Sequence, residues 1–219
     1  LDPRAGVTGE AVTAESTEVG YSTPLKTSTS VDKDLGHSLA KLKADKREFQ
    51  EGITLFNKKA KKGLAHLQSI GRLGESFDEI AEFLRATPGL DKTVIGDYLG
   101  ERDEPMIKVM HAYVDAMDFT SLTLDDAIRK FLEGFRLPGE SQKIDRLMEK
   151  FAERYHKQNP TVYKSADTAY VLSFSVIMLN TDAHNPQVKN KMTKEGFIRN
   201  NRGIDDGQDL PSEVLEELY

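Results

Sequence analysis

The stretch FLEGFRLPGESQKIDRLMEKF, Phe131–Phe151, holds two helical patterns separated by a break. Apolar residues recur at intervals of about three or four on both sides of the break, as they do on one face of an α-helix. The break, Arg136–Glu140, contains Pro138 and Gly139, which favour a tight exposed turn. We therefore predict two helices joined by a short loop, with an acid, Glu140, directly before the second helix.

Helical patterns continue outward from this stretch over the chain from Leu35 onward. Upstream, one helix is predicted over residues 123–135, and Ser76 with Glu79 forms the capping box of an earlier helix. A charged amphipathic helix that begins near Leu35 is expected to break near Gly52. We find no sustained strand alternation with hairpin signals. The sequence therefore predicts an all-α fold of about ten helices.

The segment SADTAYVLSFSVIMLNTDAHNP, residues 165–186, is apolar on nearly all sides at its centre. This pattern predicts a helix buried in the middle of a bundle. The segment is too short and too often interrupted by serine to span a bilayer. Polar residues then cluster over 180–189, and two interpretations stay open: a helix C-cap with polar neighbours, or a polar rim around an apolar groove.

Residues 1–34 are rich in Ser and Thr and show no apolar period, so we predict a disordered or linker segment before a helical domain at 35–219. The chain has no cysteine, which excludes disulfides and a thiol nucleophile. Its net charge of −6 argues against a nucleic-acid surface and against direct binding to a membrane through a chain-wide basic face. The lysines within 58–62 are expected to form a solvated face, with contact to acidic lipid as the alternative.

Most enzyme signatures are absent from the sequence. There is no glycine-rich phosphate loop, HExxH or GxSxG motif, and the five histidines are dispersed. The acids of GIDDGQDL, residues 203–210, lack the spacing of a calcium loop and predict a polar turn. We therefore expect no metal and no cofactor. A helical hydrolase that uses Glu140 and Asp145 as paired acids lacks a phosphate-binding or metal-binding constellation.

By pattern alone, Glu140 is an acid at a helix N-terminus, where the macrodipole favours negative charge. The residues around it say more. FLEGFRLPGESQKIDRLMEKFAERY and ADTAYVLSFSVIMLNTDAHNPQVKNKMT closely resemble the two signature motifs of the Sec-seven (Sec7) domain, the catalytic module of guanine-nucleotide exchange factors for ARF GTPases. The resemblance covers about residues 52–219. Its wording is most similar to the large brefeldin-inhibited (BIG-type) Golgi exchange factors, including fungal members.

The resemblance implies an elongated right-handed stack of about ten helices, with a central apolar helix and an exposed catalytic loop. It implies exchange of GDP for GTP on an ARF GTPase, and no making or breaking of covalent bonds. Glu140 matches the family's glutamic finger, which is inserted toward the GDP β-phosphate and the Mg²⁺ site of the GTPase. Two like charges about 4 Å apart at an effective dielectric near 20 repel by about 4 kcal/mol. That energy corresponds to roughly a thousandfold in nucleotide affinity.

The same match supplies candidates for the groove that receives the GTPase. They are Tyr170, Phe174, Ile177, Met178 and Asn185, with Asp145 and Met192 as further candidates. Brefeldin-sensitive members tend to carry Tyr-Ser, Asp and Met at the inhibitor site, where this chain has Phe174, Ser175, Asp182 and Met192. Three of the four agree, and Phe174 lacks the hydroxyl.

The resemblance also implies partners and location. The partner is an ARF-family GTPase in its GDP-bound and nucleotide-free states. The membrane would be reached only through ARF or through other regions, the isolated domain is expected to be monomeric, and the location is cytoplasmic, peripheral at the Golgi or trans-Golgi network. The alternative from another class is a helical scaffold that binds a GTPase without catalysing exchange. The presence of Glu140 argues against it, because such a scaffold is expected to have lost this acid.

Overall fold

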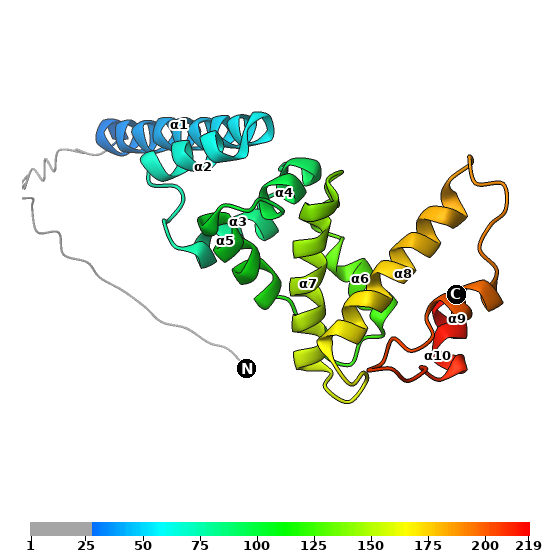
Figure 1. Ribbon diagram of the computed structural model, residues 1–219. Coiled ribbons are helices and arrows are strands. Elements are labelled where there is room, and N and C mark those ends of the chain that lie inside the picture. The colour runs from blue at the N-terminus through cyan, green and yellow to red at the C-terminus, as the bar shows by residue number, and fades with distance from the viewer. Residues whose placement is uncertain (1–27) are drawn as a thin grey trace, which may run out of the picture. The chain divides into compact units, whose positions relative to one another are not determined.

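A computed structural model describes residues 28–219, with side chains from residue 35 onward. The predicted disorder or linker at 1–34 falls mostly outside this range and stays a prediction there. The described residues fall into two units, 28–44 and 45–219. The described residues contain ten α-helices and no β-strand, which confirms the all-α prediction (Figure 1). The helices are α1 (Ser28–Lys58), α2 (Ala60–Ser69), α3 (Phe77–Ala86), α4 (Lys92–Leu99), α5 (Glu104–Asp115), α6 (Leu124–Phe131), α7 (Ser141–Gln158), α8 (Ala166–His184), α9 (Lys194–Asn200) and α10 (Ser212–Leu218).

Start and stop signals in the sequence explain many of these bounds. The Ser76 hydroxyl accepts a hydrogen bond from the Glu79 backbone N–H, and the Glu79 carboxylate accepts one from the Ser76 backbone N–H, which confirms the predicted capping box of α3. Pro105 lies in the first turn of α5, where its missing N–H costs nothing. Asn159 follows the last residue of α7 as its C-cap. Local chemistry thus sets where these helices begin and end.

The predicted break near Gly52 is wrong, because α1 continues through it to Lys58. Gly52 is buried against α2, and a Cβ atom at this position would lie 2.4 Å from Cδ2 of the buried Leu67. The glycine therefore allows two helices to pack closely, and does not interrupt the first one.

The predicted helix 123–135 is also too long, because α6 ends at Phe131 and residues 132–140 form a loop. Phe135 keeps a helical spacing in the sequence, yet in the structure it turns back into the core. Its ring meets those of Tyr113 and Phe131 edge to face, with centroid distances of 5.9 and 5.0 Å. Core packing of one aromatic side chain therefore ends the helix earlier than the pattern indicates.

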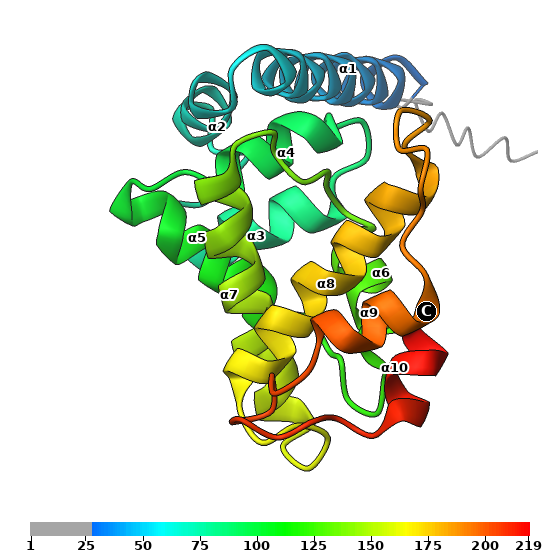
Figure 2. The same cartoon turned by 45° about the vertical axis from the view of Figure 1, so that its right-hand side comes forward.

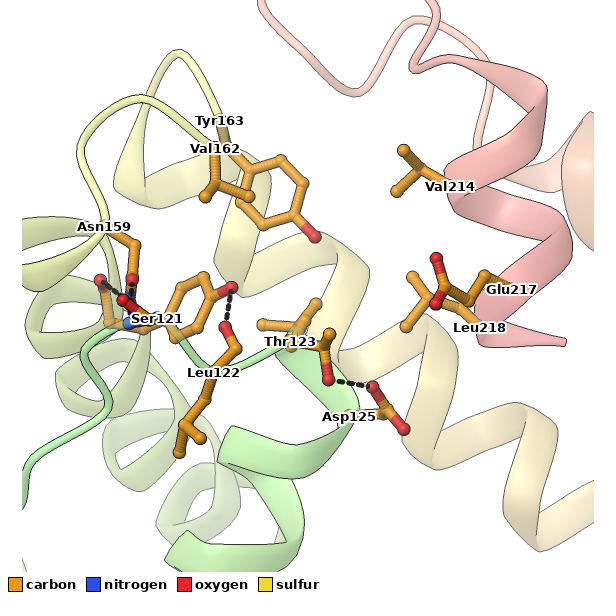
Figure 3. A pocket seen from close by; sticks show the side chains of 12 residues that line it. Ser121, Leu122, Thr123, Asp125, Asn159, Val162, Tyr163, Val214, Glu217 and Leu218 are labelled. Atoms are coloured by element: carbon orange, nitrogen blue, oxygen red, sulfur yellow. Dashed lines mark hydrogen bonds between the residues drawn. The ribbon is translucent and has the colours of Figure 1, made fainter.

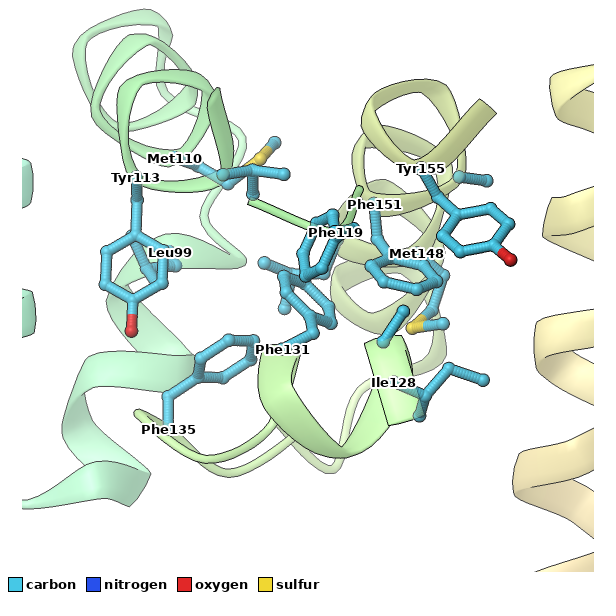
Figure 4. Packing of buried hydrophobic residues seen from close by; sticks show 14 of the residues in the cluster. Leu99, Met110, Tyr113, Phe119, Ile128, Phe131, Phe135, Met148, Phe151 and Tyr155 are labelled. Carbon is cyan, nitrogen blue, oxygen red and sulfur yellow. The ribbon is translucent and has the colours of Figure 1, made fainter. Parts of the chain in front are cut away.

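A continuous aromatic cluster occupies the middle of the unit 45–219 (Figure 4). Phe131 of α6 stacks on Phe151 of α7 at 4.9 Å, and Phe151 meets Phe119 edge to face at 5.2 Å. Burying large aromatic rings contributes strongly to stability. In both overall views, α8 runs beside α7 and α6 (Figures 1 and 2). The cluster thus fixes α6 and α7, which carry the two ends of the loop 132–140.

None of the helices described in residues 28–219 combines the length and the apolar character needed to cross a bilayer.

Candidate functional site

The loop 132–140 is held at its base by α4. The Arg136 backbone N–H donates to the Lys92 carbonyl at 3.0 Å, and the Lys92 ammonium donates back to the Glu133 carbonyl at 2.6 Å. Gly96 lies beneath the loop, where a Cβ atom would come within 1.8 Å of the Arg136 carbonyl oxygen. Only glycine permits this approach, so the loop rests directly on the backbone of α4.

The first turns of α7 fix the other end of the loop. The Lys143 ammonium forms an ion pair with Glu101 at 2.8 Å, and the Lys143 side chain is only 15% exposed. The Arg146 guanidinium donates to the Gly100 carbonyl from Nε at 3.2 Å. Pro138 is buried within the loop itself. The segment that carries Glu140 is therefore a braced projection, so little conformational entropy remains to be lost when it meets a partner.

Glu140 occupies the N-cap position of α7, with extended backbone angles of φ −95° and ψ 121°. Its carbonyl accepts the first hydrogen bonds of the helix, from Lys143 and Ile144 at 3.0 and 3.1 Å. Its side chain is exposed, makes no capping hydrogen bond and has no ion pair with any residue of 35–219. A side-chain cap would have explained an acid at this position. The structure instead leaves the carboxylate free to act on something outside the chain.

An apolar groove of about 860 Å³ lies beside the loop. Its lining includes Ile128 of α6, Leu132 and Leu137 of the loop, Ile177 of α8 and Met192, together with polar residues such as Arg129, Asp182 and Lys191. Because Leu137 belongs to the same loop as Glu140, whatever fills the groove also contacts the segment that carries the free carboxylate. The groove and the acid therefore form one site.

The helix α8 has two distinguishable faces, although its sequence is apolar all round. Its buried stripe includes Ala169, Leu172, Ser173 and Leu179. The four apolar candidates, Tyr170, Phe174, Ile177 and Met178, lie on the opposite face at intervals of three, four or one. The first three are half-buried, and Met178 is 62% exposed. None of the four belongs to the closed core, and this face is available for a partner.

Asp145 lies next to this face, since it accepts a hydrogen bond from the Tyr170 hydroxyl. This bond, together with partial burial, raises the pKa of Tyr170 to about 12. The Tyr170 ring meets that of Phe174 edge to face at 5.1 Å. Asp145 thus holds Tyr170 in place, and joins α7 to the exposed face of α8.

The polar residues at the end of α8 have two separate roles, since Asn185 is the C-cap of the helix and Asp182 lines the groove. The Asn185 side-chain oxygen accepts from the Gln187 N–H at 2.9 Å at the end of the helix, and the Asp182 carboxylate accepts from the Met192 N–H at 2.7 Å. Asp182 and Met192 both line the groove. Phe174 and Ser175 lie on α8 outside the groove lining. The structure therefore brings together two of the four inhibitor-site candidates.

Some residues that build the site carry no sequence signal. Lys92 and Gly96 support the loop through backbone carbonyls some forty residues away along the chain. In the sequence Leu137 is an ordinary apolar residue, and only the structure shows that it lines the groove. Within the described residues, no three His, Asp or Glu side chains gather in a way that could hold a metal ion.

Comparison with known proteins places this site in context. The family model described as "Sec7 domain" matches residues 45–219. The brefeldin A-inhibited guanine nucleotide-exchange protein 2 of Arabidopsis thaliana is 66% identical over 177 residues, which cover 81% of this chain and 10% of that protein. The human brefeldin A-inhibited guanine nucleotide-exchange protein 1 is 56% identical over 180 residues, with the same coverage of 81% and 10%. The chain thus spans about a tenth of the length of these curated relatives.

Two solved structures are similar throughout most of the chain. The crystal structure of the Sec7p catalytic domain matches with a TM-score of 0.74 and 55% identity, over 77% of this chain and 92% of that one. The structure of ARF1-GDP bound to a Sec7 domain complexed with brefeldin A matches with a TM-score of 0.76 and 41% identity, over 82% and 92%. That second structure contains ARF1-GDP and brefeldin A together with its Sec7 domain.

Proposed function

Because the chain belongs to the Sec7 domain family, we propose that it is a guanine-nucleotide exchange domain for ARF-family small GTPases. It binds the GDP-bound GTPase, promotes release of GDP and leaves the site open for GTP. No covalent bond is made or broken in the process. The names of its relatives, which are brefeldin A-inhibited guanine nucleotide-exchange proteins, support this activity.

The single observation that carries the proposal is the free carboxylate of Glu140. It is exposed at the tip of a braced loop, without a hydrogen bond or ion pair to any residue of 35–219. Because no group of the chain pairs with this carboxylate, its charge is available to interact with the GTPase. In the proposed mechanism it enters the nucleotide site of the GTPase, near the β-phosphate and the Mg²⁺ ion of the bound nucleotide.

Electrostatic repulsion gives the expected size of the effect. Two like charges about 4 Å apart at an effective dielectric near 20 repel by about 4 kcal/mol. A destabilisation of that size weakens nucleotide binding roughly a thousandfold. The insertion requires that the loop does not yield, and the contacts to Lys92, Gly96 and Glu101 support that requirement.

The groove and the outer face of α8 provide the binding surface in this proposal. Ile177 and Met192 would contact the switch regions of the GTPase inside the groove, and Tyr170, Phe174 and Met178 would extend the contact along the helix. Asp145 acts through its hydrogen bond to Tyr170, and Asn185 borders the contact at the end of α8. Apolar residues at the centre and polar residues at the edge are typical of such interfaces.

The groove wall also supports a proposal on inhibition by brefeldin A. Asp182 and Met192 lie side by side there, joined by the hydrogen bond from the Met192 N–H. At Phe174, sensitive members tend to have tyrosine, so this chain lacks one hydroxyl at the site. We expect weaker inhibition than in a relative that carries the tyrosine.

The cellular setting follows from the family likeness. We propose that the domain acts in Golgi vesicle transport, on the cytoplasmic side of Golgi or trans-Golgi membranes, and that it reaches the membrane through ARF or through other regions. As an isolated domain it is expected to be monomeric. It needs no cofactor of its own, because the nucleotide and its Mg²⁺ belong to the GTPase.

The test is release of fluorescent GDP from an N-terminally truncated ARF in the presence of excess GTP. The unchanged chain should accelerate release strongly. Glu140→Lys should reduce this acceleration by about a thousandfold, because it presents a positive charge to the phosphate. The variant should still bind GDP-loaded ARF in a pull-down and keep its thermal midpoint. Normal exchange by Glu140→Lys would refute the assignment of the acid.

A further inference from the structure

A second, smaller cavity of about 230 Å³ lies away from Glu140, where the start of α6 and the end of α7 face α10 (Figure 3). Apolar side chains form most of its walls, among them Leu122, Val162, Val214 and Leu218. An apolar cavity of about 150 Å³ is already large enough to bind benzene in a protein interior. The cavity thus has room for a small aromatic molecule.

The hydroxyl of Tyr163 is the feature that points to a ligand. The Tyr163 side chain is 5% exposed, and its hydroxyl is directed into the cavity between α7 and α10 (Figure 3). It makes no hydrogen bond with any residue of 35–219. The hydroxyl oxygen is not among the fully buried unpaired atoms of the described residues, which are His66 Nε2 and His156 Nδ1, so it can be reached from the cavity and can donate to a molecule that enters it.

Two other polar groups around the cavity are already paired within the chain. The Tyr155 hydroxyl donates to the Leu122 carbonyl at 3.0 Å, and the Asn159 amide donates to the Phe119 carbonyl at 3.0 Å. Burial raises the pKa of Tyr163 above its ordinary value, so its hydroxyl stays protonated and available as a donor. The cavity therefore offers two hydroxyls that are not bonded within residues 35–219, Tyr163 and the exposed Ser121, in mainly apolar surroundings.

The charges at the opening restrict the ligand further. Glu217 of α10 and Asp125 of α6 both line the cavity with carboxylates. Asp125 is partly neutralised by Arg129 at 2.6 Å, and Glu217 has no ion pair within residues 35–219. Two acids at the opening disfavour an anionic ligand through like-charge repulsion.

We propose that this cavity is a binding site for a small, uncharged, mainly apolar molecule that carries an oxygen hydrogen-bond acceptor for Tyr163. A ketone, ester or ether on an aromatic or aliphatic body has this chemistry. The inference does not depend on the proposed exchange activity, because no residue of the argument contacts Glu140. The cavity shares Asp125 and Leu218 with the groove, so its occupant would touch the groove wall from behind.

Three matched probes test the site on the 219-residue chain by titration in ¹H–¹⁵N NMR. Acetophenone has the acceptor, α-methylstyrene has the same shape without it, and benzoate carries a negative charge. Acetophenone should shift the amides of Val162, Tyr163 and Val214 saturably. It should bind about fivefold more tightly than α-methylstyrene, since a net hydrogen bond contributes about 1 kcal/mol. Benzoate should bind more weakly than either.

Two variants decide the role of each part. Tyr163→Phe should reduce acetophenone affinity to that of α-methylstyrene and leave the affinity for α-methylstyrene unchanged. Because the hydroxyl bonds nothing in the chain, this variant should fold normally. Val214→Trp should fill the cavity and abolish both. Equal affinity for acetophenone in Tyr163→Phe, tight benzoate binding, or shifts confined to the groove around Met192 would each overturn the proposal.

Discussion

Two turns of this molecule carry acids, and the two acids differ in whether their carboxylates are hydrogen-bonded within the chain. In the turn 203–210, Asp205 is 9% exposed; its carboxylate accepts hydrogen bonds from the Lys164 N–H and the Thr168 hydroxyl, both at 3.0 Å. In the loop 132–140, the Glu140 side chain is exposed, and its carboxylate bonds to no group of residues 35–219. Both turns contain glycine and precede a helix. The first acid stabilises the fold, and the second is left available for a partner.

The difference lies in how the backbone around each acid is held. At Asp205 the acid itself ties the turn to the start of α8. At Glu140 other residues perform that task, namely Lys92, Gly96 and Lys143, and the acid is not used. A loop whose shape does not depend on its acid can lose or change that acid without unfolding. This separation of support and function can be tested on both sides.

Of the changes to the two turns, Asp205→Ala is expected to have the largest effect on stability. Asp205→Ala leaves the part-buried Lys164 N–H without its acceptor, removes one of the two acceptors of the Thr168 hydroxyl and breaks the ion pair with the Lys164 ammonium, which together should cost about 2–3 kcal/mol of unfolding free energy. Urea denaturation measures this loss. GDP release well below the unfolding transition should change by less than about twofold. A stability loss under about 0.5 kcal/mol would show that the turn does not depend on this acid.

A smaller effect is expected at the support of the functional loop. Gly96→Ala forces the Arg136 carbonyl to move, which should cost about 1–2 kcal/mol after the gain in helix propensity. Because the loop shifts with that carbonyl, GDP release should also slow. Gly36→Ala is the matched control, since its Cβ atom meets nothing within 4 Å. Unchanged release in folded Gly96→Ala would mean that the position of the loop base does not matter.

The smallest effect is expected on the outer face of α8. Met178 is 62% exposed, so Met178→Ala should change unfolding free energy by less than about 0.5 kcal/mol. It should weaken the apparent binding of ARF by about fivefold in steady-state exchange assays, a loss of about 1 kcal/mol. Leu172→Ala, on the buried face of the same helix and outside the groove, should instead cost about 2–4 kcal/mol of stability with little change in binding. A large loss of stability in Met178→Ala, with unchanged binding, would show that the buried and the partner-binding faces of α8 are wrongly assigned.

Much of the fold could be predicted from the sequence, because helices depend on local signals. The capping box at Ser76 and the C-cap at Asn159 are chemical features of a few neighbouring residues. The errors arose where distant residues decide. The missing side chain of Gly52 allows Leu67 of α2 to pack closely against α1. Phe135 lies beyond the end of α6 and packs on Tyr113. No local pattern contains either partner.

The site was less predictable than the fold, for a related reason. Glu140 could be singled out by its motif, and its free state became visible only in the structure. The two faces of α8 could not be separated by pattern, because apolar residues surround the whole helix. Lys92 contacts the loop through a backbone carbonyl, which has no sequence signature.

The central claim is that the charge of Glu140 drives GDP release and does not support the fold. The most direct measurement pairs Glu140→Gln with Asp205→Asn, two neutral variants of similar size, in GDP release and in urea denaturation. We expect Glu140→Gln to lose most of its acceleration of release at unchanged stability, and Asp205→Asn to lose stability at nearly unchanged release. Normal release by Glu140→Gln, or a loss of its stability comparable to that of Asp205→Asn, would contradict the account.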